Sequence, residues 1–299
     1  MIDLHTHTVF SDGTTTPAEN AALAAAEGLA GLAFTDHDTL AGWEQAAEAC
    51  ARHRLEFVPG IELSTEVDGL SVHILGYWCD PHHTGLRAEC DRLAHARRRR
   101  ARSIIDRLAE LGVACPLEQV LVHAGDAPVG RPHIAAAMVD AGVVPDTRAA
   151  FDEYLADGGP AYVPKHALAP ADGVRLIRAA GGAAVIAHPG LETRAAPTGT
   201  VLVEELRAAG LAGVEADHPG HDAATAAFWR AFARDRDLLA TGCSDFHGDA
   251  QHGKIGERTT SRATLEALRE RSDGCVDEKP GGEHRSDPAG GRETKEGLW

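Results

Sequence analysis

The spacing of apolar and polar residues changes along the chain and predicts two kinds of segment. Short apolar runs predict buried strands, and longer amphipathic segments between them predict helices. One helix should begin at Thr16-Pro17-Ala18-Glu19, which has the capping-box pattern. The expected strands are Ile2–His7, Leu29–Thr35, Phe57–Glu62, Ser71–Trp78, Ala183–Ala187, Gly213–His218 and Leu238–Gly242. This order favours a mostly parallel α/β fold.

The middle of the chain has helical patterns and no convincing strand. We expect helices over Leu86–Leu111, after Gly130-Arg131-Pro132, and over Asp146–Ala156. The predicted organisation is therefore a main α/β domain formed by residues 1–85 and 160–270, with a helical insertion over residues 86–159 that serves as a lid or substrate subdomain. Residues 272–299 contain almost no apolar side chains, which predicts a disordered tail.

Composition and charge narrow the function classes. The chain has 299 residues, of which 43% are hydrophobic, and a formal net charge of −16. That charge argues against broad binding to a nucleic-acid backbone, so no stable binding of duplex nucleic acid is expected. No apolar run approaches the roughly 20 residues that cross a bilayer, and no signal peptide is visible. Six cysteines without a C-x-x-C pair predict reduced thiols, so a cytoplasmic location without membrane contact is expected.

The positions of the histidines point to metal chemistry. His5 and His7 project to the same side of the first strand, and Asp12 follows in the next loop. This pair alone is as compatible with two surface histidines as with half of a metal site. The later strand ends add ligand-type residues, namely His37, Glu62, His73, His188, Asp245 and His247.

Carboxyl ends of strands form the active-site face of α/β folds, so these residues should converge. Nine such ligands are too many for one ion and predict a cluster of two or three divalent metals, with a carboxylate such as Glu62 bridging two of them. The mixture of imidazole and carboxylate suits manganese, zinc or iron.

Six motifs, in this order, resemble the PHP (polymerase and histidinol phosphatase) family. They are Asp3-Leu4-His5-Thr6-His7 with Ser11-Asp12-Gly13, Thr35-Asp36-His37-Asp38, Gly60-Ile61-Glu62, His73-Ile74-Leu75-Gly76, Ala187-His188-Pro189 and Ser244-Asp245-Phe246-His247. The resemblance covers about residues 1–260 and implies a distorted (β/α)7 barrel with a trinuclear metal centre. It implies one metal on His5, His7, Glu62 and Asp245, a second on Glu62, His73 and His188, and a third on Asp12, His37 and His247.

A finer resemblance is to the 3′,5′-nucleoside bisphosphate phosphatases of that family. It rests on the close spacing of Glu62 and His73, the helical insertion and the motif Gly130-Arg131-Pro132-His133-Ile134-Ala135. It implies removal of the 3′-phosphate from nucleoside 3′,5′-bisphosphates by a metal-activated hydroxide, with AMP or short oligonucleotides as further substrates and trimming of RNA 5′ ends in some relatives. Manganese is the expected metal, with zinc or iron as alternatives.

Two other functions remain open at this stage. One is a histidinol-phosphatase-like or general phosphoesterase of the same family. The other is a noncatalytic PHP binding module, which the complete ligand set disfavours.

Candidate substrate contacts are less constrained. The run Arg97–Arg100 with Arg102 is either a solvated helix face or a phosphate site, and the resemblance favours Arg99 and Arg102 as contacts. Arg131 and His133 lie at an expected helix start, a favourable place for an anion. His218 ends a strand and is either a substrate contact or proton donor or a polar rim residue. Substrate contacts are also expected from Asp12 and His37, and catalysis from His5, His7, Glu62, Asp245 and His218.

Overall fold

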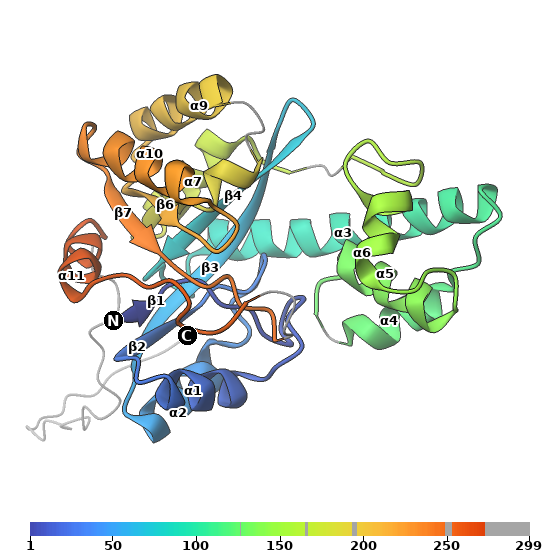
Figure 1. The fold of residues 1–299 in the computed structure, drawn as a ribbon, viewed down its shortest axis with the longest axis horizontal. Coiled ribbons are helices and arrows are strands. Elements are labelled where there is room, and N and C mark those ends of the chain that lie inside the picture. The colour runs from blue at the N-terminus through green and yellow to red at the C-terminus, as the bar shows by residue number, and fades with distance from the viewer. Residues whose placement is uncertain (126, 165–166, 193–195, 249–252, 273–299) are drawn as a thin grey trace, which may run out of the picture.

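The barrel expected from the sequence is confirmed in the computed structural model (Figure 1), which describes residues 1–125, 127–164, 167–192, 196–248 and 253–272. Of the expected tail over residues 272–299, the part from residue 273 on lies outside these residues. Seven strands form one sheet in sequence order: β1 (Ile2–Asp3), β2 (Gly31–Phe34), β3 (Glu56–Val67), β4 (Leu70–Tyr77), β5 (Ala183–Ile186), β6 (Gly213–Asp217) and β7 (Leu239–Gly242). Beyond β1 and β7, Thr6 forms a bridge with Phe246, so the two edges of the sheet meet in a nearly closed barrel.

Strand direction explains how two of the expected ligands reach the site. All neighbouring strands are parallel except β4, which runs antiparallel to both β3 and β5. The hairpin register pairs Glu62 with Leu75 and Ser64 with His73. His73 therefore comes from the amino-terminal half of β4, and Glu62 lies inside β3, which continues to Val67. The prediction that both residues end strands was wrong. Because β4 runs in the opposite direction, its amino-terminal half nevertheless brings His73 to the same end of the barrel as the carboxyl ends of the parallel strands.

Helices cover the outside of the barrel (Figure 1). They are α1 (Pro17–Ala26), α2 (Trp43–His53), α7 (Pro170–Ala179), α8 (Pro189–Glu192), α9 (Ala196–Ala208), α10 (Ala223–Arg234) and α11 (Arg262–Glu270). The capping box is present, because Glu19 N–H donates to Thr16 Oγ1 at 3.3 Å and Thr16 N–H donates to the Glu19 carboxylate at 2.7 Å. Helices α8, α9 and α11 were not predicted from the sequence. No helix in the described part of the chain is long and apolar enough to cross a membrane.

A group of helices extends from the barrel between β4 and α7. It contains α3 (Thr84–Glu110), α4 (Leu117–Ala124), α5 (Arg131–Asp140), α6 (Thr147–Ala150) and the π-helix η1 (Phe151–Leu155). Figure 1 shows α3 running from the barrel into this group. Leu86 and Leu93 of α3 pack into the barrel core, whereas Ile104 and Leu108 pack with Met138 in a separate core. One long helix thus connects two hydrophobic cores. Helix α4 was not predicted from the sequence.

Candidate metal centre

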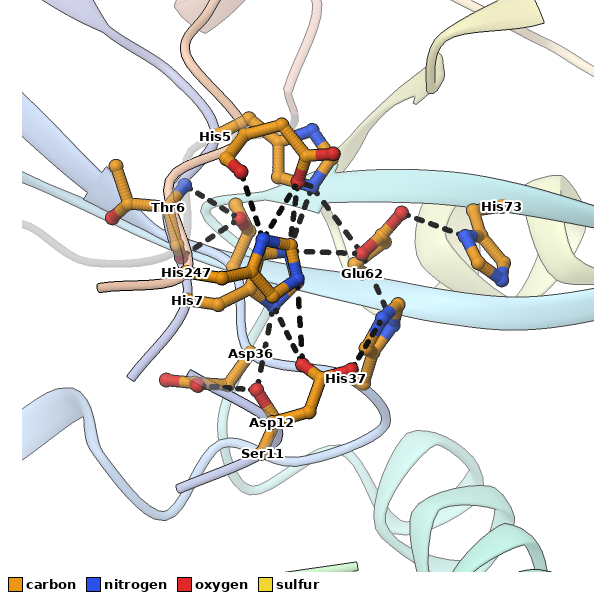
Figure 2. A network of polar contacts seen from close by, with 12 residues as sticks. His5, Thr6, His7, Ser11, Asp12, Asp36, His37, Glu62, His73 and His247 are labelled. Atoms are coloured by element: carbon orange, nitrogen blue, oxygen red, sulfur yellow. Dashed lines mark hydrogen bonds and ion pairs between the residues drawn. The ribbon is translucent and has the colours of Figure 1, made fainter. Parts of the chain in front are cut away.

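Glu62 lies at the centre of a cluster of histidines at one end of the barrel (Figure 2). Its Oε2 is 3.2 Å from His5 Nε2, 3.1 Å from His7 Nε2 and 3.0 Å from His37 Nδ1, and its Oε1 is 2.9 Å from His73 Nδ1 and 3.2 Å from His188 Nε2. One buried carboxylate therefore faces five imidazoles that come from four separate segments of the chain. A carboxylate that bridges two metal ions needs other ligands around both of its oxygens, as here.

Two aspartates extend the cluster on either side of Glu62. Asp245 Oδ1 lies 3.3 Å from Nε2 of both His5 and His7. Asp12 lies 3.7 Å from His7 Nδ1 and from His37 Nε2, and 3.5 Å from His247 Nε2. The structure thus brings together all nine ligand-type residues that the sequence analysis selected.

The ligand atoms form overlapping groups in which each atom lies within 4.8 Å of the others. Four groups draw on the nine residues: His7, Asp12, His37 and His247; His5, His7 and Asp245; His5, Glu62 and His188; and His37, Glu62 and His73. A fifth group joins His5 with Glu215 and Cys243, which the sequence did not single out as ligands. The partition among three metals that the resemblance implied fits these groups in part, because His7 also joins the Asp12 group and His37 also joins Glu62 and His73.

The local backbone is specialised where it carries these side chains. A Cβ on Gly13 would lie 2.7 Å from the carbonyl carbon of His7 and from the Thr8 nitrogen, so only glycine lets this loop fold back and bring Asp12 to His7. His188 and Asp245 have φ angles of 24° and 51°, in the left-handed region that non-glycine residues rarely occupy. Such conformations persist where surrounding contacts enforce them, and they concentrate at functional sites.

Burial and mutual charge perturb the titration of the cluster. Burial would raise the pKa of Glu62, but the neighbouring His37, His73 and His5 hold it well below its usual range. Burial would lower the pKa of His7, but Asp245 and Glu62 raise it to about 10. For His37 burial dominates over the pull of Glu62 and lowers the pKa to about 3. These opposed pKa shifts show that several carboxylates and imidazoles are buried close together. Such a buried cluster of ionisable groups is typical of a functional site.

Divalent metal ions fit this donor set. The buried oxygens Asp12 Oδ1 and Asp245 Oδ1 accept no hydrogen bond from any described residue. Buried polar atoms normally have a partner, so these two oxygens point to a positively charged group in the cluster. The donors are imidazole nitrogens and carboxylate oxygens, which suit zinc, manganese and iron.

Three buried carboxylates support the cluster without being among the nine expected ligands, namely Asp3, Asp36 and Glu215. Asp36 accepts hydrogen bonds from Thr8 N–H and Ser11 Oγ at 2.8 and 2.6 Å, and so holds the loop before Asp12. Asp3 accepts from Ser244 N–H at 2.9 Å. Glu215 in β6 lies 3.0 Å from His5 Nδ1. Burial would raise the pKa of Glu215, but His5 lowers it to about 2. A lone glutamate between Val214 and Ala216 in a buried strand was the signal for this last residue.

A cavity of about 170 Å³ opens beside the cluster and carries three arginines. Asp12, His37 and His73 line it on the barrel side, and Arg97, Arg100 and Arg131 line it on the helical side. Arg99 and Arg102, which the resemblance favoured as contacts, lie on the exposed side of α3 and are not among the residues that line this cavity. Arg97 and Arg100 are three positions apart and share the inward face.

The three arginines are held in different ways. Arg97 Nε donates to Asp38 Oδ2 at 2.8 Å and its Nη2 donates to Ser64 Oγ at 2.8 Å. Arg131 Nη1 pairs with Asp157 Oδ1 at 2.6 Å. Arg100 Nε donates to the Val163 carbonyl oxygen at 2.6 Å. The guanidinium groups are therefore oriented before any ligand binds.

His133 and His218 have distinct settings. Gly130 N–H donates to His133 Nδ1 at 2.9 Å, so this side chain caps the start of α5, and burial lowers its pKa. Gly220 N–H donates to His218 Nδ1 at 2.9 Å, and His218 Nε2 lies 3.2 Å from Asp245 Oδ2. Since Nδ1 of the neutral His218 ring is an acceptor, Nε2 carries the proton and faces the cluster.

A second cavity, of about 1090 Å³, lies between the loop that carries Asp12 and the helices α4 to α6. Its lining includes apolar side chains such as Phe10, Val122 and Ala136, and it also includes His133. Asp12, Pro132 and Phe151 line both cavities, so the two meet beside the cluster.

Comparisons with known proteins agree with this geometry. A model of the PHP domain matches residues 3–112. The chain is 35% identical over 254 residues to a 3′,5′-nucleoside bisphosphate phosphatase of Chromobacterium violaceum, covering 85% of this chain and 89% of that protein. It is 33% identical over 245 residues to a 5′-3′ exoribonuclease of Haemophilus influenzae, covering 82% and 89%.

A similar fold has been solved from Bifidobacterium adolescentis, in a structure described as that of a metal-dependent phosphoesterase. It superposes with a TM-score of 0.84 at 32% identity, covering 91% of this chain and 96% of that chain. The resemblance carried by the six motifs is thereby confirmed. The chain belongs to the PHP family of metal-dependent phosphoesterases.

Proposed function

We propose that this protein is a phosphatase that removes the 3′-phosphate from nucleoside 3′,5′-bisphosphates. The observation that carries the proposal is the cavity in which Arg97, Arg100 and Arg131 face Asp12, His37 and His73. A ligand with two phosphates can place one at the metal ligands and the other among the guanidinium groups, which bind phosphate bidentately. The proposal is also supported by the bisphosphate phosphatase among the similar proteins.

In this proposal two or three divalent ions, manganese first and zinc or iron as alternatives, are held by the residues that Glu62 gathers. The ligands are His5, His7, Asp12, His37, Glu62, His73, His188, Asp245 and His247. When bound, such ions supply a hydroxide nucleophile at neutral pH and charge for the phosphoryl oxygens. His218 holds a proton at Nε2 beside Asp245 and is the candidate to protonate the leaving oxygen.

The second cavity is proposed to take the nucleoside. Its apolar lining, with Phe10 and Val122, suits a base and ribose better than a row of phosphates. Because the two cavities meet at Asp12 and Phe151, one nucleotide can reach both with its phosphoester at the cluster. In this arrangement residues 86–159 act as the substrate subdomain.

A second candidate activity is the trimming of RNA 5′ ends. The size of the second cavity, about 1090 Å³, exceeds the range of roughly 300–1,000 Å³ typical of small-ligand pockets and supports a longer substrate. A relative named as a 5′-3′ exoribonuclease supports the same activity. The cytoplasmic location expected from the sequence remains a prediction.

A substrate panel tests the proposal. Protein stripped with a chelator and reloaded with manganese, zinc or iron is assayed for phosphate release from adenosine 3′,5′-bisphosphate, AMP and histidinol phosphate, and for nucleotide release from short RNA. We expect the highest kcat/KM for the bisphosphate, and no turnover by the stripped protein. Preference for histidinol phosphate would contradict the substrate assignment. No turnover of any substrate by fully loaded protein would favour a noncatalytic binding module.

A further inference from the structure

Glu215 contacts two of the proposed metal ligands at once. Its Oε1 lies 3.0 Å from His5 Nδ1, and its Oε2 accepts a hydrogen bond from the backbone N–H of His188 at 2.8 Å. The side chain is 1% exposed, so water does not compete for either contact. His5 follows β1 and His188 follows β5, which lie apart in the sheet. A single carboxylate from β6 therefore joins two ligand-bearing segments.

We propose that Glu215 is a positioning residue that sets the tautomer of His5 and the backbone of His188 for metal binding. An ionised carboxylate only accepts hydrogen bonds, so the nitrogen facing it, His5 Nδ1, must carry the proton. The lone pair of the neutral ring then lies on Nε2, which points at Glu62 and Asp245. This inference rests on the proposed ligand set, in which Glu215 has no part.

The contact with His188 has its own consequence. His188 has a φ angle of 24°, a conformation that needs external support. Glu215 Oε2 supplies that support through the N–H of the strained residue, while His188 Nε2 lies 3.2 Å from Glu62. Loss of the contact should let the backbone relax and move the imidazole away from Glu62.

Glutamine at this position has nearly the same volume but cannot satisfy both contacts. If its carbonyl oxygen accepts from His5, its amide nitrogen faces the His188 N–H, and two donors oppose each other. If the side chain is flipped, the amide donates to His5 Nδ1 and forces the proton onto Nε2, which then cannot bind a metal. A role in packing alone would tolerate glutamine. Aspartate keeps both acceptors and the charge, so it should restore part of what glutamine loses.

Metal affinity, measured by competition with a chelator, tests this inference without reference to activity. We expect Glu215→Gln to weaken binding of at least one ion about 10- to 100-fold, the usual effect of removing a partner of a metal-bound histidine, and Glu215→Asp to weaken it less. Glu89→Gln is the matched control, because Glu89 is also buried but pairs with Arg92 in α3. Wild-type affinity in the folded Glu215→Gln protein would overturn the inference.

A measurement on the wild type guards against a variant that fails to fold. In zinc-loaded protein with ¹⁵N-labelled histidine, NMR should show the proton of His5 on Nδ1. A proton on Nε2 would overturn the positioning role. If the wild type bound no metal at all, the proposed function itself would fail, which is a separate outcome.

Discussion

Replacement of Arg100 by methionine tests which charge binds the second phosphate. Among the three arginines of the cavity, Arg97 is balanced by Asp38 and Arg131 by Asp157. No described carboxylate forms an ion pair with Arg100, which donates to a backbone oxygen instead. Burial and the neighbouring Arg131 lower its pKa to about 10, so the guanidinium is still charged near neutral pH. Its positive charge is therefore the most available to an incoming anion.

The magnitude follows from the lost interaction. A hydrogen bond to a charged group contributes about 1.5–3 kcal/mol, and every 1.4 kcal/mol corresponds to a factor of ten. Arg100→Met should therefore lower kcat/KM for adenosine 3′,5′-bisphosphate about 10- to 100-fold. The same variant should change kcat/KM for 3′-AMP, which lacks the second phosphate, by less than about 3-fold.

Steady-state phosphate release at saturating metal gives kcat/KM for adenosine 3′,5′-bisphosphate and for 3′-AMP, and the ratio of these two values is the quantity compared. Arg99→Met is the matched control: it removes the same charge from the adjacent residue on the exposed side of α3. We expect the Arg99 variant to keep the wild-type ratio of the two kcat/KM values. An unchanged ratio in Arg100→Met, or an equal fall in Arg99→Met, would refute the assignment of the inward face.

Two further predictions concern the cluster and its surroundings. His5→Ala and Asp245→Asn should each abolish turnover while circular dichroism stays like the wild type, and near wild-type activity in either would contradict the ligand assignment. Burial raises the pKa of Asp3 to about 6 from 3.8, so its proton is bound more tightly in the folded state. Asp3 therefore contributes about 3 kcal/mol to the free energy of unfolding below pH 3.8, and this contribution is lost as the pH rises through 6. Denaturant unfolding of metal-free wild type against Asp3→Asn between pH 4 and 8 measures it, and a pH-independent difference would contradict it.

The nine ligand-type residues were predictable because they lie in short motifs next to predicted strands. His37 and His188 each follow the carboxyl end of a strand, and the barrel brings the carboxyl ends of its parallel strands together. The direction of β4 was not predictable from its own residues. An apolar strand has the same pattern in either direction, and here the two-residue turn Asp68-Gly69, with φ angles of 51° and 79°, makes β4 return antiparallel to β3. His73 therefore lies beside Glu62 as expected, although its expected place at the end of a strand was wrong.

The arginines show a different limit. Helical periodicity predicts which residues share a face, and it does not predict which face turns inward. That depends on contacts distant in sequence, here the pairing of Arg97 with Asp38 and Ser64 from the barrel. Glu215 was missed for a related reason. A single buried glutamate becomes interpretable only when its partners, His5 and His188, are seen beside it.

The division of charge between the two parts of the molecule carries a consequence for specificity. A chain with a net charge of −16 repels a phosphorylated nucleotide at long range, so attraction must be local. In the proposed function the barrel supplies it through metals, and α3 and α5 supply it through Arg97, Arg100 and Arg131. The metal site binds a phosphoester group that many substrates share. The arginines instead bind a second anionic group, which only some substrates carry. Changes in α3 or α5 can therefore alter which phosphoester is chosen while Glu62 and its histidines stay as they are.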